Sequence, residues 1–142
     1  HDPALAEDAI HEAFARMLKS EARPQRDALA YVFAAVRNAA RDARRRLVRL
    51  ELHKEVGLVL PTHDPVADAV RNEEQVRTAA ALEGLGDDDK QVVVLRIYGQ
   101  LSFEQIAEVC AEPLPTVSTR YRRALVKLRQ RLEKVHSAAG VV

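Results

Sequence analysis

The sequence predicts an all-α protein built from two small helical domains, the second of which is a four-helix domain with a helix-turn-helix. Apolar residues recur at three- and four-residue spacing over several segments, and no segment shows the alternation of a half-buried strand. Glycine and proline interrupt the helical pattern at intervals. The expected domains are residues 1–55 and 67–142, joined by a linker at residues 56–66.

The composition is that of a soluble globular protein. Apolar residues make up 47% of the chain and charged residues 30%, a balance unlike that of a disordered or a membrane protein. No apolar run approaches the ~20 residues that span a bilayer. Because Cys110 is the single cysteine, no intrachain disulfide can form, and a reducing, cytoplasmic location is expected.

The first domain is expected to contain two helices. Asp2 and Pro3 form an N-cap followed by the proline favoured in a first helical turn, and this helix is expected to end before Pro24. Asp27 can cap a second helix, whose apolar stripe runs to Leu50. The opposite face of the second helix carries a run of arginines: Arg37, Arg41, Arg44, Arg45, Arg46 and Arg49.

The second domain is expected to open with two helices separated by glycines. Asp64 and Pro65 repeat the cap signal and begin a helix that extends to about Glu83. Three aspartates, residues 87–89, place negative charge at the positive end of the next helix, which Gly99 terminates.

Residues 103–123 meet the requirements of a helix-turn-helix. The motif needs a small residue where its helices touch, apolar residues that clamp them, and a second helix whose polar face can enter the major groove. Ser102 and Gln105 have capping-box spacing for the first helix, where Ala107 is the small residue, and Pro115 opens the second helix. The expected clamp residues are Ile106, Cys110 and Val117. The apolar stripe of the second helix comprises Val117, Tyr121, Ala124, Leu125, Leu128 and Leu132.

Basic residues are concentrated in two places, although the formal net charge is only +1. Residues 115–134 carry seven basic side chains against the single Glu133, whereas residues 56–90 carry 3 basic against 8 acidic side chains. Solvated helix faces and polyanion-binding faces both fit the basic stretches. The basic excess on the second helix of the motif favours DNA binding over a helical hairpin within an ordinary bundle.

The second domain resembles a known family. We identify a similarity to region four of extracytoplasmic-function (ECF) sigma factors in the stretch LEGLGDDDKQVVVLRIYGQLSFEQIAEVCAEPLPTVSTRYRRALVKLRQRL. That region has a leucine-rich helix, an L-S-x-x-E/Q-I-A core and a T-V-x-S/T-R stretch before a basic helix. In the first domain, the acidic helix of region two resembles AEDAIHEAFARML, and its promoter-melting helix resembles AYVFAAVRNAARDARRR.

The resemblance implies a sigma factor that directs RNA polymerase core to promoters and initiates transcription. It implies that the last helix reads the minus-thirty-five element through contacts to base edges and to phosphates. The residues expected at base edges are Ser118, Thr119 and Arg122. Those expected at phosphates are Thr116, Arg120 and Arg123. For Arg120 the alternative is packing against the first helix of the motif.

By the same resemblance, one face of the arginine-bearing helix lies at the minus-ten element during strand opening. Arginine suits this role because it neutralises phosphates. The residues of this face are Arg37, Asn38, Arg41, Arg44 and Arg45. The aromatic residues Tyr31 and Phe33 have the helical spacing of core residues, and stacking on exposed bases is the alternative.

The acidic helix of the first domain resembles the surface that docks on the polymerase clamp. The residues of this surface are Glu7, Asp8, His11 and Glu12, and a merely solvated face is the alternative. The implied partners are the β and β′ subunits of RNA polymerase core and promoter DNA. An anti-sigma factor is a further partner that the sequence leaves open, and no membrane partner is expected.

Two departures from the family concern the turn and the N-terminus. Ala111 replaces the turn glycine and Glu112 the apolar residue after it, while Pro113 and Pro115 can stiffen the turn instead. The helix with which region two usually begins is absent, and the chain starts at His1 without methionine. The first domain is therefore expected to be N-terminally incomplete.

Other classes of function explain less of the sequence. The histidines are scattered and no glycine-rich phosphate loop exists, so no catalytic residue, metal or cofactor is expected. Cys110 lies on an apolar helix face, where a buried hydrophobe is more common than a nucleophile. A helix-turn-helix regulator of the response-regulator output type would leave the arginine-bearing helix unexplained, and a protein-binding helical adaptor is the third alternative.

Overall fold

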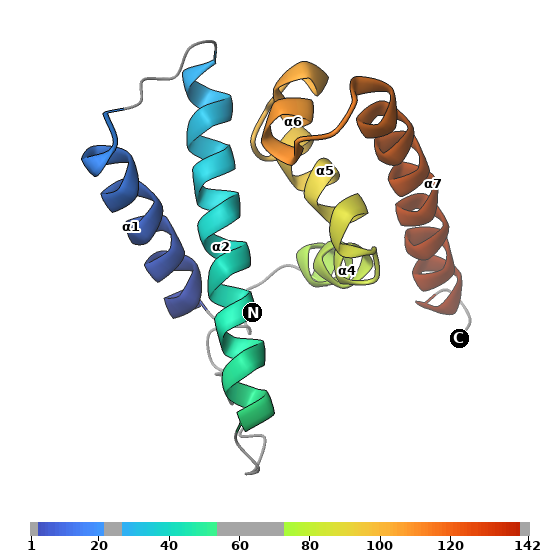
Figure 1. Cartoon of the computed structure of the whole chain (residues 1–142). Helices are drawn as coiled ribbons and strands as arrows, with labels where there is room; N and C mark the ends of the chain where they lie inside the picture. The colour runs from blue at the N-terminus through green and yellow to red at the C-terminus, as the bar shows by residue number, and fades with distance from the viewer. Residues whose placement is uncertain (1–2, 22–26, 54–72, 140–142) are drawn as a thin grey trace. The chain divides into compact units, whose positions relative to one another are not determined.

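The computed structural model describes residues 3–21, 27–53 and 73–139, and these residues form six helices and no strand. The helices are α1 (Pro3–Lys19), α2 (Ala28–His53), α4 (Glu73–Glu83), α5 (Asp87–Ile97), α6 (Phe103–Cys110) and α7 (Leu114–Ala139) (Figure 1). The predicted all-α class is therefore confirmed. Within the described ranges, no helix is long and apolar enough to cross a membrane.

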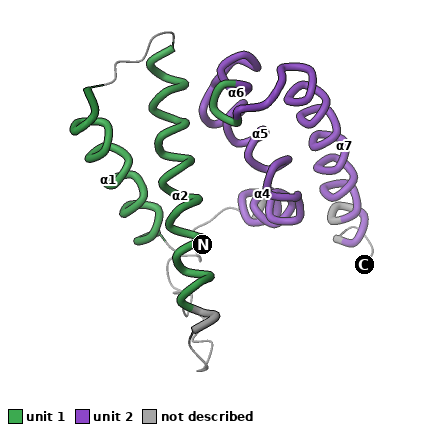
Figure 2. Tube along the Cα trace, viewed as in Figure 1, with its two compact units in different colours: residues 1–62, 108–110 green, residues 63–107, 111–142 purple. Residues whose placement is uncertain are grey.

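The chain divides into two compact units (Figure 2). Unit 1 comprises residues 1–62 and 108–110, and unit 2 comprises residues 63–107 and 111–142. The predicted linker, residues 56–66, and the predicted helix start at Asp64 lie outside the described residues. The boundaries expected from the sequence therefore stay predictions.

Unit 1 is a pair of helices, α1 and α2, that meet through small side chains. Ala9, Ala13 and Ala39 are buried between them, and Ala35 and Val36 pack against this cluster. Alanine at the contact allows the two helix backbones to approach closely. At the start of α2, the side chain of Asp27 accepts a hydrogen bond of 3.0 Å from the backbone N–H of Ala30, which confirms the predicted N-cap.

Unit 2 is built around a core that α4, α5, α6 and α7 supply together. The core cluster comprises Leu85, Val93 and Ala124, with Leu82, Tyr121 and Leu128 packed against it. Four further side chains are fully buried: Val92, Leu101, Ile106 and Val117. Burial of each such aliphatic side chain contributes about 1.5–3 kcal/mol to stability. The predicted clamp residues, including Cys110, are all buried.

The stripe predicted for α7 is wrong at two positions. Leu125 is 38% exposed and Leu132 is 39% exposed, whereas Val117 and Ala124 are fully buried. Helical periodicity indicates which residues share a face, but the extent of the packing partner decides how far along the helix that face is covered.

Glycine is required at the end of α5. A Cβ atom at Gly99 would lie 2.6 Å from the carbonyl oxygen of Leu95, closer than such atoms approach in proteins. The backbone N–H of Gly99 donates to the carbonyl of Val94, and Gln100 follows with a φ of 54°. The predicted termination of this helix at Gly99 is therefore confirmed.

Candidate nucleic-acid interface

The first helix of the helix-turn-helix, α6, begins with a capping box. The side-chain oxygen of Ser102 accepts a hydrogen bond of 3.1 Å from the backbone N–H of Gln105. In return, the Gln105 side chain accepts one of 2.8 Å from the backbone N–H of Ser102. The predicted capping box is therefore confirmed, and it fixes the start of α6 at Phe103, directly after Ser102.

Three side chains connect α5, α6 and α7. The Arg96 guanidinium lies 4.8 Å from the centre of the Phe103 ring and donates a 2.7 Å hydrogen bond to the carbonyl of Leu101. The Phe103 ring meets that of Tyr121 edge to face, with centroids 5.4 Å apart. Such an aromatic pair contributes about 0.5–1.5 kcal/mol beyond its buried area. These contacts hold α6 and α7, the two helices of the motif, in a fixed arrangement.

The turn between α6 and α7 has a left-handed residue at Ala111, whose φ is 53°. The backbone N–H of the next residue, Glu112, donates to the carbonyl of Ala107 at 3.0 Å and closes the end of α6. An alanine in this conformation costs about 1–2 kcal/mol relative to a conformation without steric strain. The departure from glycine thus leaves strain in the turn.

Replacing Ala111 with glycine is expected to stabilise the chain by about 0.5–1 kcal/mol, because glycine adopts a positive φ without a Cβ clash and loses only part of that gain to unfolded-state entropy. Urea unfolding followed by circular dichroism measures the change. The control is Ala79→Gly in the exposed part of α4, where glycine should destabilise by about 0.5–1 kcal/mol. Equal destabilisation by both variants would show that Ala111 is not strained.

The second helix of the motif, α7, presents a polar face away from the core. Thr116, Thr119 and Arg122 follow one another at three-residue spacing and are all exposed, while Val117 is buried. Ser118 is half-buried. Within the described part of the chain, Arg122 has no ion-pair partner. Of the six residues predicted to contact the minus-thirty-five element, Thr116, Thr119 and Arg122 therefore form an exposed row along α7.

Arg120 is held inside the motif. Its guanidinium donates a hydrogen bond of 2.8 Å to the Glu112 carboxylate, and the two side chains are only 17% and 26% exposed. This hydrogen bond to Glu112 raises the pKa of Arg120 further above its ordinary value, against the effect of burial. Arg120 therefore packs against the turn, where Glu112 holds it. This is close to the alternative that the sequence leaves open, which is packing against the first helix of the motif.

Two further basic residues of α7 share one carboxylate. The Asp89 side chain, in the first turn of α5, is 8% exposed and lies 2.7 Å from the Lys127 ammonium. The Arg123 guanidinium lies 3.4 Å from the other carboxylate oxygen of Asp89 and is 59% exposed. Arg123 is therefore accessible to a phosphate but already has an anionic neighbour.

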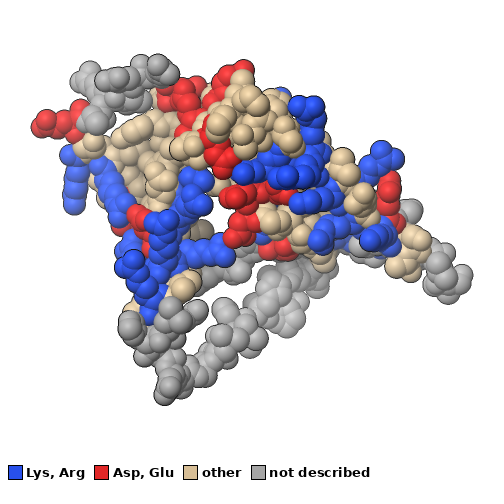
Figure 3. All heavy atoms as spheres, turned by 45° about the vertical axis from the view of Figure 1, so that its right-hand side comes forward, with Lys and Arg blue, Asp and Glu red and all other residues tan. Residues whose placement is uncertain are grey.

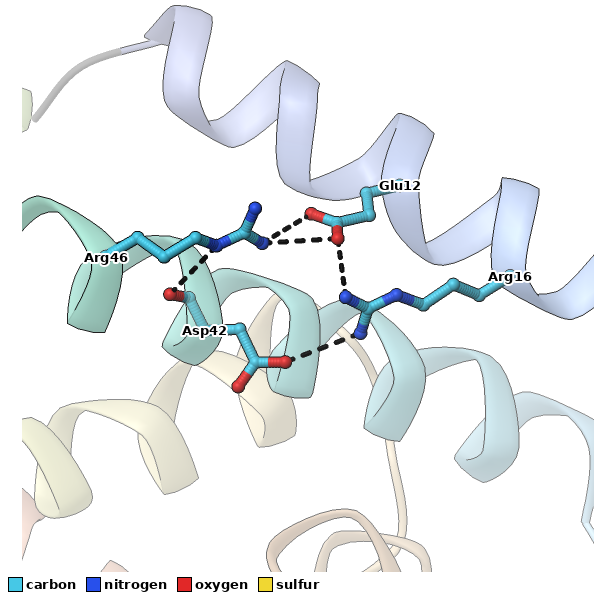
Figure 4. Close-up of polar contacts among 4 residues, drawn as sticks. All are labelled: Glu12, Arg16, Asp42 and Arg46. Atoms are coloured by element: carbon cyan, nitrogen blue, oxygen red, sulfur yellow. Dashed lines mark hydrogen bonds and ion pairs between the residues drawn. The ribbon is translucent and has the colours of Figure 1, made fainter.

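In unit 1, α1 and α2 are joined by a network of four charged side chains, Glu12, Arg16, Asp42 and Arg46 (Figure 4). Arg46 donates a 2.9 Å hydrogen bond to the Glu12 carboxylate, which also accepts one from Arg16, and Arg16 lies 3.4 Å from Asp42. The hydrogen bond from Arg46 is the main cause that lowers the pKa of Glu12. Glu12 was predicted to contact polymerase, and in this structure it links the two helices.

The remaining predicted residues of unit 1 lie on two exposed helix faces. On α2, Asn38, Arg41, Arg44 and Arg45 are exposed and Arg37 is half-buried. On α1, Glu7, Asp8 and His11 are exposed. A groove of about 340 Å³ between the two helices is lined in part by Arg16, Tyr31 and Asn38. Tyr31 and Phe33 are both half-buried, which fits both core packing and stacking on exposed bases.

Both halves of the chain match family models of one protein family. The model described as Sigma-70 region 2 matches residues 1–50, and the model described as Sigma-70, region 4 matches residues 81–130. The chain belongs to the sigma-70 family. The region 4 match begins near the end of α4 and includes the whole motif, and the region 2 match includes α1 and most of α2.

Among sigma-70 relatives, the chain is similar to ECF sigma factors. It is 37% identical over 71 residues to the ECF RNA polymerase sigma factor SigK of Mycobacterium ulcerans, a match that covers 49% of this chain and 38% of the relative. It is 32% identical over 85 residues to the RNA polymerase sigma factor YlaC of Bacillus subtilis, covering 59% of this chain and 49% of the relative. Each match therefore spans less than half of the relative's length.

A solved sigma factor shows the same fold. The structure is that of RpoE in complex with the anti-sigma factor NepR from Bartonella quintana, with a TM-score of 0.65 and 20% sequence identity. The similarity covers 92% of this chain and 80% of that chain. The all-α fold predicted from the sequence is therefore confirmed by this similarity as well.

Sequence reasoning missed the acidic partners of the predicted DNA-binding residues. The sequence indicates Asp89 only as a charge at a helix start, yet in the structure its carboxylate lies 3.4 Å from the guanidinium of Arg123, which is 34 positions away in the chain. Glu112 stands out in the sequence only as a departure from the sigma-70 pattern. The unusual acid in the turn and the basic position eight residues later were the available signal for that pair.

Proposed function

We propose that this sigma-70 chain directs RNA polymerase core to promoters and takes part in transcription initiation as a DNA-recognition subunit without catalysis. The observation that supports this most directly is the exposed row of Thr116, Thr119 and Arg122 on α7. The row belongs to the second helix of a helix-turn-helix, the element that enters the major groove in this class of motif.

In this proposal α7 reads the minus-thirty-five element. Thr119 and Arg122 contact base edges, with Ser118 beside them, and Thr116 contacts a phosphate at the start of the helix. Arg123 also contacts a phosphate when it leaves Asp89. Arg120 acts indirectly, because its ion pair with Glu112 fixes the start of α7 relative to α6.

The face of α2 is proposed to contact the minus-ten element. Its exposed guanidinium groups would neutralise phosphates of the separating strands. The residues of this face are Arg37, Asn38, Arg41, Arg44 and Arg45. The α1 face with Glu7, Asp8 and His11 is proposed to dock on the β and β′ subunits of polymerase core. Glu12 joins α1 to α2, because its carboxylate accepts hydrogen bonds from Arg46 of α2 and from Arg16 of α1.

An anti-sigma factor is a further proposed partner, since RpoE is seen in complex with one. That complex concerns a protein 20% identical to this chain, so the partner here would be identified by its own binding experiment.

Run-off transcription with core polymerase, this chain and a promoter library tests the proposal. The expected result is transcripts that depend on both the chain and the promoter sequence. A parallel anisotropy assay measures binding of the same duplexes without polymerase as salt rises, since a DNA reader loses affinity steeply. Sequence-dependent binding without transcripts would assign the chain to other helix-turn-helix regulators, and absence of both would overturn the proposal.

A further inference from the structure

The basic residues of α7 are divided between those with an acidic partner inside unit 2 and those without one. Lys127 and Arg123 face the carboxylate of Asp89 from two positions one helical turn apart. Arg122 stands beside Arg123 in the chain but has no such partner in the described ranges. Figure 3 shows the result at the surface, where blue basic side chains of unit 2 interleave with red acidic ones.

The carboxyl group of Asp89 is buried and nevertheless ionised. Burial raises the pKa of its carboxyl group, but the hydrogen bonds and charges of Lys127 and Arg123 outweigh this effect and the pKa is lowered. Its negative charge is therefore present at neutral pH, 2.7 Å from Lys127. Both basic partners remain reachable from solvent, because Lys127 is 46% exposed and Arg123 is 59% exposed.

We propose that Asp89 limits the affinity of unit 2 for DNA, because it competes with DNA phosphates for Lys127 and Arg123 and so weakens binding to every duplex by a similar factor. The inference rests on the proposed DNA-reading function of α7. Asp89 acts through its two basic partners, so it is a positioning residue that touches no DNA itself.

The physical basis is the release of counterions. A basic side chain that is free in the unbound protein releases a counterion when it binds a phosphate, which adds about −0.9 to the slope of log K against log salt. One such contact makes binding about eightfold tighter at 0.1 M than at 1 M salt. Lys127 and Arg123 must first leave Asp89, so their contribution is reduced on every sequence. Arg122 has no internal acid to leave, so base reading keeps its full effect.

Fluorescence anisotropy measures the affinity of the whole chain for duplex DNA at salt concentrations from about 0.05 to about 0.5 M. The slope of log K against log salt is determined over this range. Each variant is measured on a preferred duplex and on a scrambled duplex. Asp89→Asn is expected to bind both duplexes severalfold tighter and to steepen the slope by about 1–2 on each. The ratio of preferred to scrambled affinity should stay unchanged, because phosphate contacts strengthen binding to any sequence.

Two further variants separate the proposal from a simple charge effect. Glu133→Gln removes the same charge from an exposed pair with Arg129 on the same helix. Because solvent screens an exposed pair, Glu133 restrains Arg129 only weakly, and this variant should change both duplexes much less. Adding Lys127→Gln to Asp89→Asn should return the slope toward the wild-type value, whereas Lys127→Gln alone should leave it nearly unchanged. If Asp89→Asn fails to fold, the slope of Lys127→Gln alone still tests the proposal, because a Lys127 that is paired with Asp89 should contribute little to the wild-type slope.

Lower affinity with an unchanged slope in Asp89→Asn would give Asp89 a purely structural role and overturn the inference. An equal effect of Glu133→Gln would overturn it as well. The proposed function fails separately, because a wild-type chain without any preference among duplexes would refute DNA reading whatever Asp89 does.

Discussion

Replacing Ile106 with alanine is expected to lower the free energy of unfolding of unit 2 by about 2–5 kcal/mol. Ile106 lies in α6, is fully buried and is one of the largest buried side chains in the described part of the chain. Alanine would leave a cavity between the helices of the motif, because a packed core relaxes only partly around a deleted side chain. Small domains have about 5–15 kcal/mol of stability in total, so this loss is a large fraction.

Urea unfolding followed by circular dichroism measures this change. The matched control is Ile97→Ala, which removes the same atoms from a side chain on α5 that is 50% exposed. We expect the control to cost less than about 1 kcal/mol, since it creates no buried cavity. Equal losses in the two variants would mean that α6 does not pack on the core in solution.

The helices and their ends could be predicted because they depend on residues close together in the chain. The N-cap at Asp27 and the capping box of Ser102 and Gln105 each join residues three positions apart. The burial of Ile106 and Val117 followed from helical spacing in the same way. Each feature is fixed by local geometry, and sequence patterns report local geometry directly.

The partners of charged side chains could not be predicted in the same way. Arg120 and Arg123 were both expected at phosphates because they are basic residues on the second helix of the motif. In the structure Glu112 and Asp89 lie beside them. Asp89 reaches α7 because α5 packs against that helix, a contact between segments more than thirty residues apart. Helical periodicity carries no information on such pairings.

The Glu12 assignment shows the same limit in unit 1. An acidic residue on an amphipathic helix was expected to face polymerase, but Arg46, 34 positions away, donates to its carboxylate. Such exposed pairs contribute little to stability, because solvent and salt screen them. The network therefore does little for stability, but it orients the two helices of unit 1 relative to each other.

Replacing Arg122 with alanine is expected to weaken binding to a preferred minus-thirty-five duplex by about 1–3 kcal/mol, or roughly 5- to 150-fold, and to relax the sequence preference. The reason is the geometry of guanidinium, which can donate two hydrogen bonds to the major-groove edge of guanine. Arg122 is exposed on the same face as Thr119 and has no ion pair to break among the described residues. Anisotropy titrations on the preferred duplex and its single-base variants measure both effects.

The control variant is Arg129→Ala, which removes the same charge from the same helix. Arg129 is 81% exposed and pairs with Glu133, two helical turns beyond the reading face. Its loss should reduce affinity slightly and by the same factor on every duplex, as expected for a long-range electrostatic contribution. If Arg122→Ala also weakens all duplexes equally, Arg122 contacts a phosphate. Base reading by α7 would then depend on Thr119 and Ser118, whose hydroxyl groups donate or accept single hydrogen bonds and discriminate less sharply among bases.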